Sequence, residues 1–578
     1  MSFSVTLENG LSLRVRDINL QAELKGNEIK FAYQGLSNDP IGSGYVLAIT
    51  EFAFDRNAVL LGDGFQMCSQ TTGTIETPMD VGRYSEQSAP YRLYSSSSAK
   101  RYYNYLLVEE MSGYTLFGFT SCYRFSGYFE LVEVEQQHWV KICLDGEDTY
   151  PQDWSSNQLE SMVILQGDSL NQLYFEYAHF ISLHHAPKLG AKKQSPIGWC
   201  SWYAYNENLS QELIVANLNQ MTGSLEALDY VMIDDGYQRY MGDWLMPSSL
   251  FPRGIKPLAH DIKRCGKKTA IWLAPFIVQE ESEIFRNHKD WLVTHQDGSP
   301  LKAEEVTYGG WRCTPWYILD ATNPDVHEHL INIMTVMRKD WGIELFKLDA
   351  LFWGALKGTR EQNGITGVEA YRMGMSAINQ GAGSALVLGC NAPFWPSLGL
   401  VDAMRVSDDV ERNGQRFIQI ARETFFRSWQ HRKLWQVDPD CATLISLSNK
   451  AIESHYLEFH RNVLLACGGI LMSGDPLNHI SHFAKSTLSR LFVRHKHNQN
   501  SARFSSLSLD HAYLKMNDKS DLHCLFNFDS SIRVMCLTSR IAVDWHDYWS
   551  GEKLNDKPVD VLEVSLPPRA SLAILTKR

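Results

Sequence analysis

Residues 327–349 read HEHLINIMTVMRKDWGIELFKLD, a stretch that joins a helical pattern to a short strand. In residues 327–341 apolar side chains recur every three or four positions, as on the buried face of an amphipathic helix. Residues 345–348 then form a short apolar strand that ends at Asp349. A strand that alternates with a helix in this way is one unit of an α/β fold.

The same unit recurs along the middle of the chain. Eight short apolar strands are predicted, at residues 197–202, 230–234, 269–274, 345–348, 385–390, 403–407, 434–437 and 469–473. Helical patterns lie between them, for example over residues 211–221 and 415–431. Eight alternations predict a (β/α)8 TIM barrel rather than an open doubly wound sheet.

The two flanks have a different pattern. Residues 44–50 (GYVLAIT) and 102–108 (YYNYLLV) are short alternating segments between polar turns, which is typical of an antiparallel β-sandwich. Short strands return after the barrel. The sequence therefore predicts a multidomain α/β plus all-β protein, with an N-terminal β-sandwich over residues 1–185, a catalytic barrel over 190–487 and a small C-terminal β-sandwich over 490–578. Residues 186–196 (APKLGAKKQSP) are predicted to be a linker.

Composition and charge exclude several classes of function. The chain has 54 Lys and Arg residues against 66 Asp and Glu residues, and a net charge of −12 argues against nucleic-acid binding. The most apolar window, residues 463–472 (VLLACGGILM), is shorter than the roughly 18 residues that a spanning helix needs. The first residues sustain no secretory apolar run, and 11 cysteines without a Cys-x-x-Cys pair indicate reduced thiols. We expect a soluble cytoplasmic protein that binds neither membrane nor nucleic acid.

The chemistry of a barrel belongs to side chains at the carboxyl ends of its strands. The side chains at these ends are Trp202, Tyr203, Asp234, Asp235, Trp272, Lys347, Asp349, Cys390, Asn391, Arg405, Asp408, Asp409, Asp438, Asp440 and Asp475. Carboxylates gather there, together with aromatic rings and a few cations.

Strand periodicity sorts the carboxylates further. Lys347 and Asp349 share one face of a strand, and a neighbouring cation keeps a carboxylate ionised, as a nucleophile requires. Arg405 and Asp409 share a face as long as their strand stays regular, and Asp408 then lies opposite. One ionised and one protonated carboxyl group are the apparatus for cleaving a glycosidic bond.

Other interpretations remain open for part of this set. An Asp at the end of a strand is often only a helix cap or turn former, and Asp438, Asp440 and Asp475 fit that role equally well. The His-x-His pairs at 327/329 and 495/497 diverge on a helix, so a solvated face is favoured over a metal site. No P-loop and no Gly-x-Ser-x-Gly motif is present. We expect no metal and no cofactor.

Eight strings that occur in order carry a family resemblance. They are residues 198–203 (GWCSWY), 233–237 (IDDGY), 242–244 (GDW), 272–276 (WLAPF), 346–349 (FKLD), 388–393 (LGCNAP), 404–409 (MRVSDD) and 438–441 (DPDC). Together they resemble bacterial α-galactosidases of glycoside hydrolase family 36. The resemblance covers the whole predicted barrel, and the β-rich flanks agree with the domain order of that family.

The resemblance implies an exo-acting retaining α-galactosidase that works by double displacement. By the Lys-x-Asp motif, Asp349 is the nucleophile that forms a β-galactosyl ester. By the Arg-x-x-x-Asp motif, Asp409 is the acid/base. Retaining enzymes hold these two carboxyl groups roughly 5–5.5 Å apart.

The resemblance also assigns the recognition of the sugar. Asp234 and Asp235 accept hydrogen bonds from the 4- and 6-hydroxyls, and Lys347 donates to the 3- and 4-hydroxyls. Cys390 and Arg405 lie near the 2-hydroxyl, and the rings of Trp202, Tyr203 and Trp272 wall the pocket. The implied substrates are small α-galactoside oligosaccharides. The sequence predicts no oligomeric state.

Three departures from the family pattern concern the leaving group and specificity. Ser407-Asp408 precedes the acid/base where relatives commonly have Gly-Pro, and the following segment, residues 410–414, looks shorter. Phe65 stands in a Gly-Phe-Gln string where the family has a Trp that closes the pocket. An α-N-acetylgalactosaminidase or an α-galactosyl transferase is therefore the alternative within this chemistry. A non-catalytic α-galactoside-binding protein is a remote alternative.

Overall fold

The computed structural model describes residues 3–7, 10–35, 39–55, 57–82, 93, 98–135, 137–188, 194–447 and 451–577. The chain divides into two compact units. Unit 1 comprises residues 1–189, 238–257 and 271–405, and unit 2 comprises residues 190–237, 258–270 and 406–578. Of the predicted linker, residues 189–193 lie outside the described residues.

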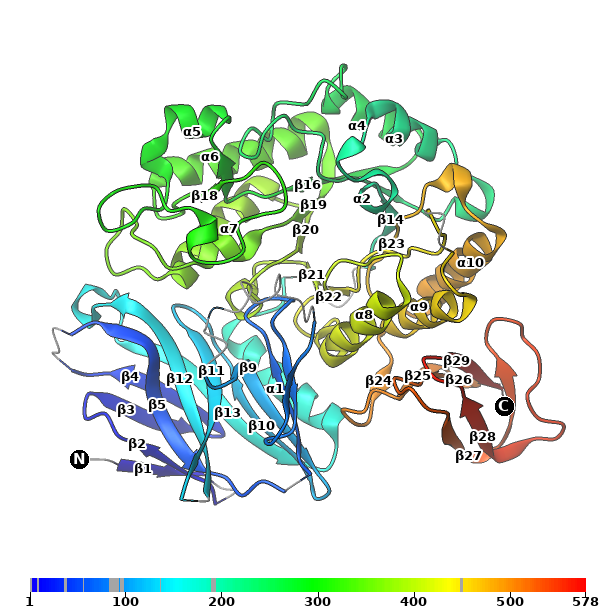
Figure 1. Ribbon diagram of the computed structural model, residues 1–578, viewed down its shortest axis with the longest axis horizontal. Helices are drawn as coiled ribbons and strands as arrows, with labels where there is room; N and C mark the ends of the chain where they lie inside the picture. Colours follow the sequence, from blue (N-terminus) through cyan, green and yellow to red (C-terminus); the bar gives the residue numbers. More distant parts are fainter. Residues whose placement is uncertain are drawn as a thin grey trace. The chain divides into compact units, whose positions relative to one another are not determined.

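Unit 1 begins with a 13-stranded sheet whose registered strand pairs are antiparallel (blue to cyan in Figure 1). Its strands are β1 (Phe3–Thr6), β2 (Ser12–Val15), β3 (Leu20–Lys25), β4 (Glu28–Tyr33), β5 (Ile41–Glu51), β6 (Val59–Asp63), β7 (Thr71–Gly73), β8 (Pro78–Asp80), β9 (Arg101–Glu110), β10 (Gly113–Phe119), β11 (Ser126–Val134), β12 (Gln137–Thr149) and β13 (Gln158–Gly167). Alternation buries one face, as in β2, where Leu13 and Val15 are fully buried. Helix α1 (Leu170–His184) packs on β10 and β13, and Tyr177 Oη donates to the Phe119 carbonyl at 2.8 Å.

The predicted barrel strands are confirmed as one eight-stranded sheet in the order β22-β21-β20-β19-β16-β15-β14-β23, and its registered pairs are parallel. The strands are β14 (Ile197–Cys200), β15 (Tyr230–Ile233), β16 (Lys268–Leu273), β19 (Ile343–Leu348), β20 (Leu386–Gly389), β21 (Ala403–Arg405), β22 (Gln436–Asp438) and β23 (Leu471–Ser473). Each begins and ends within two residues of its predicted bounds. Buried apolar side chains on both faces explain why these strands read as continuous apolar runs.

The last two strands of the sheet are joined within unit 2. The N–H of Ile470 donates to the Val437 carbonyl at 2.9 Å, and the N–H of Ala442 donates to the Met472 carbonyl at 2.7 Å. These bonds connect the segment of β22 to that of β23. The sheet order therefore returns on itself, as the (β/α)8 prediction requires.

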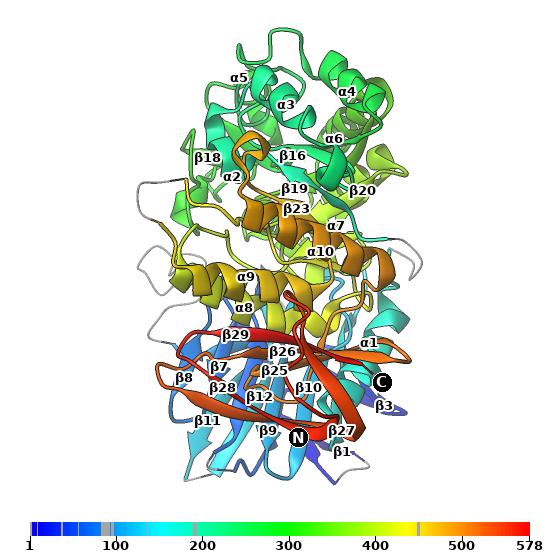
Figure 2. The same ribbon diagram turned by 90° about the vertical axis from the view of Figure 1, so that its right-hand side faces the viewer.

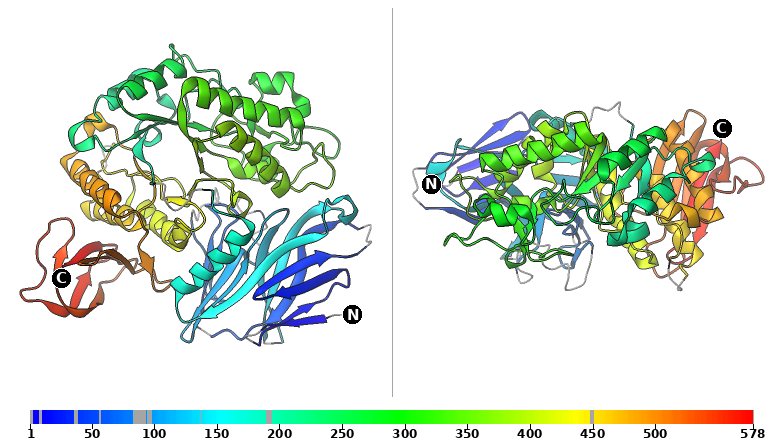
Figure 3. Two further views of the ribbon diagram at one scale, coloured as in Figure 1. Left: turned by 180° about the vertical axis from the view of Figure 1, so that it is seen from behind. Right: turned by 90° about the horizontal axis from the view of Figure 1, so that it is seen from above.

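Helices follow most of these strands. They are α2 (Trp202–Tyr205), α3 (Gln211–Leu218), α4 (Ile255–Arg264), α5 (Glu283–Asn287), α6 (Pro324–Val336), α7 (Gly367–Ala382), α8 (Gly414–Arg427), α9 (Ser454–Cys467) and α10 (His482–His497). The predicted helix over 327–341 is α6 continued by a π-helical turn, Met337–Trp341. In unit 1, α6 and α7 lie side by side (green in Figures 1 and 3). An antiparallel pair that was not predicted, β17 (Ile277–Gln279) with β18 (Trp316–Ile318), also belongs to unit 1.

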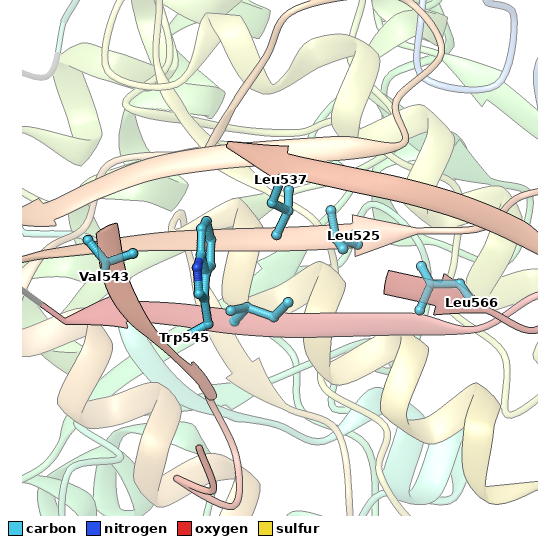
Figure 4. Packing of buried hydrophobic residues seen from close by; sticks show 6 residues of the cluster. Leu525, Leu537, Val543, Trp545 and Leu566 are labelled. Atoms are coloured by element: carbon cyan, nitrogen blue, oxygen red, sulfur yellow. The ribbon is translucent and has the colours of Figure 1, made fainter. Parts of the chain in front are cut away.

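Unit 2 ends in a six-stranded sheet in the order β24-β25-β26-β29-β27-β28 (orange to red in Figure 2). Its strands are β24 (Arg503–Phe504), β25 (His511–Asn517), β26 (Ser520–Phe526), β27 (Arg533–Asp547), β28 (Val559–Leu566) and β29 (Ser571–Lys577). Its core gathers Leu525, Leu537, Val543 and Leu566 around Trp545 (Figure 4). The prediction of β-rich flanks around a barrel is thus confirmed, and the exact domain boundaries stay a prediction.

Two absences are findings about the described residues alone. Within them, no helix is both long and apolar enough to cross a bilayer. Among the same residues, no group of three or more His, Cys, Asp and Glu side chains is arranged to hold a metal ion.

The predicted solvated face is wrong for His495, which is 4% exposed because it lies on the buried side of α10. Burial lowers the pKa of this imidazole to about 3.

Candidate active site

The carboxyl ends of three strands in unit 1 are aligned by backbone hydrogen bonds. The N–H of Asp349, just after β19, donates to the Leu273 carbonyl at the end of β16 at 2.8 Å. The N–H of Cys390, just after β20, donates to the Leu348 carbonyl at 2.7 Å. The predicted residues Trp272, Asp349 and Cys390 therefore lie on neighbouring strand ends of one rim.

The Asp349 carboxylate accepts two N–H donors. The indole Nε1 of Trp272 donates to Oδ2 at 3.1 Å, and the backbone N–H of Ala350 donates to Oδ1 at 2.7 Å. Asp349 is half-buried, and Ala350 has the left-handed backbone conformation, with φ of 51°. Donors on both oxygens stabilise the ionised form and fix the direction of the carboxylate.

Two of the predicted cations belong to barrel strands of unit 1. Lys347 is buried in β19, two positions before Asp349, which follows the end of that strand. Arg405 ends β21, is 1% exposed, and points its Nη1 to the Cys390 thiol sulfur at 3.9 Å. The structure thus brings Arg405 and Cys390 together, two residues that the resemblance assigns to the surroundings of the 2-hydroxyl.

An aromatic cluster that was not predicted surrounds Trp272. Its ring centroid lies 5.9 Å from that of Trp244 and 6.3 Å from that of Trp311. Trp311 in turn lies 4.6 Å from Trp316, and Trp316 lies 5.5 Å from Trp353. Trp244 and Trp311 lie in loops, whereas Trp316 begins β18 and Trp353 lies in a short 3-10 helix. No single periodic pattern links these rings, so the only signal in the sequence was the high overall content of Trp. The cluster holds the Trp272 indole in place.

The N-terminal loop that carries Phe65 contacts the barrel segment after β20. The N–H of Phe394 donates to the Phe65 carbonyl at 2.9 Å, and Asn104 Nδ2 donates to the Gly64 carbonyl at 3.1 Å. The Phe65 ring is buried and lies edge-on to Tyr103, with centroids 5.8 Å apart. Both ends of this contact belong to unit 1. The Gly-Phe-Gln loop is therefore fixed three residues from Asn391.

In unit 2, the predicted pair Asp234 and Asp235 follows β15 directly and is buried. The Asp234 carboxylate accepts from the Cys200 thiol at 3.3 Å and from the N–H of Asp235 at 2.9 Å. The N–H of Asp234 donates to Ser201 Oγ at 3.0 Å. The ends of β14 and β15 are thus joined around the Asp234 carboxylate.

Trp202 and Tyr203 do not stand at the end of the first strand as predicted. Strand β14 ends at Cys200, and both residues begin the short helix α2, where their side chains are half-exposed. The Tyr203 hydroxyl donates to Asp440 Oδ2, which also accepts from the N–H of Val410 at 2.7 Å. An aromatic ring in unit 2 is therefore linked to the segment that follows Asp409.

The two neighbouring carboxylates after β21 differ in their surroundings. The prediction that Arg405 and Asp409 share one face of a regular strand is wrong, because β21 ends at Arg405 and does not reach Asp409. Asp408 is buried and accepts from Arg416 Nη1 at 2.8 Å, whereas Asp409 is half-exposed. This difference supports Asp409 over Asp408 as the reactive group.

The acids whose role was left open have structural partners. Asp438 Oδ1 accepts from the N–H of Asp440 at 3.0 Å, and Asp475 accepts from the N–H of Leu444 at 2.8 Å and from Arg412 Nη2 at 2.8 Å. Arg412 also donates to the Tyr203 carbonyl at 2.7 Å. Burial raises the pKa of Asp475 to about 6 in spite of its arginine partner. Arg412 was missed in the sequence because its partners lie far along the chain.

Comparison with known proteins relates the chain to a family of glycosidases. Residues 156–362 match the family model described as Melibiase, a segment that includes Trp272, Lys347 and Asp349. Alpha-galactosidase 2 from Pediococcus pentosaceus is 25% identical over 154 residues, which cover 25% of this chain and 19% of the relative. Alpha-galactosidase AgaA from Geobacillus stearothermophilus is 25% identical over 191 residues, which cover 31% of this chain and 26% of the relative. The chain therefore spans about a fifth to a quarter of the length of these relatives.

Solved structures agree over a longer range. TtGalA, an alpha-galactosidase from Thermus thermophilus, matches with a TM-score of 0.67 at 21% identity, and the match covers 86% of this chain and 95% of the relative. The family 36 alpha-galactosidase AgaA matches with a TM-score of 0.64 at 15% identity over 98% of this chain and 81% of the relative. The comparisons confirm the resemblance to family 36 α-galactosidases and the fold that it implies.

Proposed function

We propose that this protein is an exo-acting retaining α-galactosidase that releases terminal α-linked galactose from oligosaccharides by double displacement. The observation that carries the proposal is the Asp349 carboxylate, which accepts from Trp272 Nε1 and from the Ala350 N–H within the segment that matches the Melibiase family. Those donors leave an ionised, directed oxygen, which is what attack on an anomeric carbon requires.

In the proposed first step, an Asp349 oxygen attacks the anomeric carbon as the bond to the leaving oxygen breaks. Asp409 gives its proton to that leaving oxygen, and a β-galactosyl ester remains on Asp349. In the second step Asp409 takes a proton from water, the water oxygen attacks the same carbon, and the ester bond breaks. Two inversions yield α-galactose. The half-exposed state of Asp409 supports this role, because a proton donor must be accessible to substrate and water.

The sugar is recognised in this proposal by buried polar side chains. Asp234 and Asp235 accept from the 4- and 6-hydroxyls, and Lys347 donates to the 3- and 4-hydroxyls. Cys390 and Arg405, which contact each other, lie toward the 2-hydroxyl. The rings of Trp202, Tyr203 and Trp272 pack on the apolar C–H face. A site of this kind rejects sugars that leave its buried polar groups without partners.

The relatives suggest the class of substrate. Structures of TtGalA contain p-nitrophenyl α-galactopyranoside or stachyose, and a structure of an AgaA variant contains raffinose. We propose small α-galactosides of this kind for the present chain. We also propose that it works in the cytoplasm, in keeping with its 11 free cysteines, most of which are buried.

Azide rescue tests the proposed mechanism. Asp349→Ala is expected to lose roughly 10³-fold or more of the kcat on p-nitrophenyl α-galactoside. Added azide restores turnover and yields β-galactosyl azide, because azide enters from the face that the carboxylate occupied. Asp409→Ala with azide yields the α-azide instead, because the nucleophile is intact. Glu344→Ala, at an exposed acid of the same strand β19, serves as the matched control and keeps full activity.

Either of two outcomes would contradict the proposal. If Asp349→Ala retains the activity of the parent protein, or if azide yields no galactosyl azide from either variant, the assignment of the two carboxyl groups is wrong.

A second candidate substrate is an α-N-acetylgalactosaminide. The side chain of Asn391 is 4% exposed, and its Oδ1 has no hydrogen-bond partner within the described part of the chain. Asn391 follows Cys390, the residue proposed to lie near the 2-hydroxyl, and an acetamide N–H at that carbon would supply the missing donor. Parallel assays with nitrophenyl α-galactoside and its N-acetyl analogue decide between the two sugars. A galactosyl transferase is distinguished by products formed with added acceptor sugars.

A further inference from the structure

Three consecutive backbone N–H groups around Asp409 are each bound by a carboxylate in unit 2. The N–H of Asp408 donates to Glu423 Oε2, that of Asp409 to Asp408 Oδ1, and that of Val410 to Asp440 Oδ2, each at 2.7 Å. Hydrogen bonds to charged acceptors are shorter and stronger than those between neutral groups. The backbone that carries Asp409 is therefore fixed at three successive positions.

The first two of these acceptors belong to a network on one side of α8. Arg416, Gln419 and Glu423 are spaced by three and four residues, so they share a helix face. Arg416 Nη1 donates to Asp408 Oδ2 at 2.8 Å and to Gln419 Oε1 at 2.8 Å. Gln419 Nε2 donates to Glu423 Oε1 at 2.9 Å. Both carboxyl groups are thus oriented by the same helix.

Burial makes this network costly. Glu423 is fully buried, and burial together with the charge of Asp408 raises the pKa of its carboxyl to about 7. A buried group of ions is often no better for stability than apolar side chains of similar volume. A positioning role for the network is consistent with its position directly behind the proposed acid/base.

We propose that Asp408, Arg416 and Glu423 are positioning residues that hold the backbone of Asp409 in the orientation needed for proton transfer to the leaving oxygen. This inference rests on the proposed function and deepens it. Asp408 stands where relatives commonly have proline. Its carboxylate accepts from the N–H of Asp409, and Glu423 accepts from the N–H of Asp408, a donor that proline lacks. These two bonds then fix the backbone at this position in place of the proline ring.

The dependence of rate on the leaving group tests the proposal. Nitrophenolate leaves without a proton, whereas the glucose of melibiose needs one. Glu423→Leu, which keeps the side-chain volume, is expected to lower kcat/KM on melibiose about 10- to 100-fold, and on nitrophenyl α-galactoside by less than about 3-fold. Glu423→Gln keeps an acceptor for the Asp408 N–H and is expected to recover most of the loss on melibiose. Gln415→Ala, at an exposed position of the same helix, is the control and leaves both values unchanged.

A second measurement does not depend on activity. Amide hydrogen exchange over residues 406–412 is expected to be at least about 10-fold faster in Glu423→Leu than in the parent protein, because the anchored N–H groups open more often. An equal loss of kcat/KM on both substrates, or unchanged exchange in this segment, overturns the positioning role. A parent protein that is inactive on both substrates overturns the proposed function instead, and the exchange result still decides whether the network fixes this backbone.

Discussion

Trp272 and Asp349 are joined by a hydrogen bond of 3.1 Å from the indole Nε1 to the carboxylate Oδ2. Trp272→Phe removes this donor and keeps a ring in the wall. We expect kcat on nitrophenyl α-galactoside to fall about 10-fold, which corresponds to about 1.4 kcal/mol, with a smaller change in KM. Steady-state kinetics measure both constants. An unchanged kcat would show that the indole N–H does not assist the carboxylate.

Phe65 belongs to the N-terminal loop fixed beside Phe394. Phe65→Ala leaves the backbone contact intact and removes the ring. If the ring closes the pocket as its family counterpart does, KM for raffinose rises about 5- to 30-fold, which corresponds to about 1–2 kcal/mol of lost contact, while kcat changes little. Phe65→Trp retains the ring and gives a KM within a few-fold of the parent value. A fall in kcat with constant KM would contradict this role.

Arg124 connects the N-terminal sheet of unit 1 to helix α7. Its Nε donates to Glu369 Oε1 at 2.9 Å, and its Nη1 donates to the Ser156 carbonyl at 2.8 Å. Arg124→Ala leaves the nearly buried Glu369 carboxylate without this cation. We expect the free energy of unfolding, measured in urea, to fall by about 3 kcal/mol. Lys25→Ala is the control: it breaks the pair Lys25–Glu23, whose side chains are 57% and 58% exposed, and is expected to cost less than about 0.5 kcal/mol.

His431 makes the stability of unit 2 sensitive to acid. Its Nδ1 accepts from the N–H of Val437 at 3.2 Å, so the neutral ring donates from Nε2 to the Gln499 carbonyl at 2.8 Å. Burial lowers the pKa of this imidazole to about 3, so below the unfolded pKa of about 6.5 the unfolded chain binds a proton that the folded chain does not. Stability is therefore complete above about pH 6.5 and declines as the pH falls toward 3.

The matching experiment is thermal unfolding between pH 7.5 and 5. A buried histidine with this pKa lowers the free energy of unfolding by about 2 kcal/mol at pH 5 relative to neutral pH. The Tm of His431→Gln is therefore expected to fall less steeply with acidification, whatever its value at pH 7.5. His482→Gln, at an exposed position of α10, keeps the slope of the parent protein. Equal slopes for all three proteins would contradict a neutral buried His431.

The sequence was sufficient for the barrel and for most of its rim because both depend on local periodicity. Buried parallel strands are short apolar runs, so β15 and β19 could be located within two residues. Their first polar residue marks the rim, which is how Asp234 and Asp349 were found. Cys390 and Arg405 were placed by the same reasoning, and the structure brings them into contact.

The remainder depends on contacts between distant segments. Periodicity could not show that β21 stops at Arg405, because the apolar Val406 continues the pattern while its N–H already donates to the Asp438 carbonyl. The hydrogen-bond partners of Arg412 lie up to 209 residues away in the sequence, so its neighbours in the sequence could not indicate these contacts. Residues 415–431 were predicted to be helical, but periodicity could not show that the charged residues Arg416 and Glu423 on this helix are buried.

The left-handed backbone at Ala350 has an evolutionary consequence. The left-handed backbone conformation restricts which side chains this position tolerates. Glycine and asparagine are admitted there, whereas valine, isoleucine and threonine are strained. The N–H of the same residue binds Asp349, so a strained substitution would turn the carboxylate itself. Few residue types are therefore tolerated at the position next to the proposed nucleophile, and the small side chain of alanine is one of them.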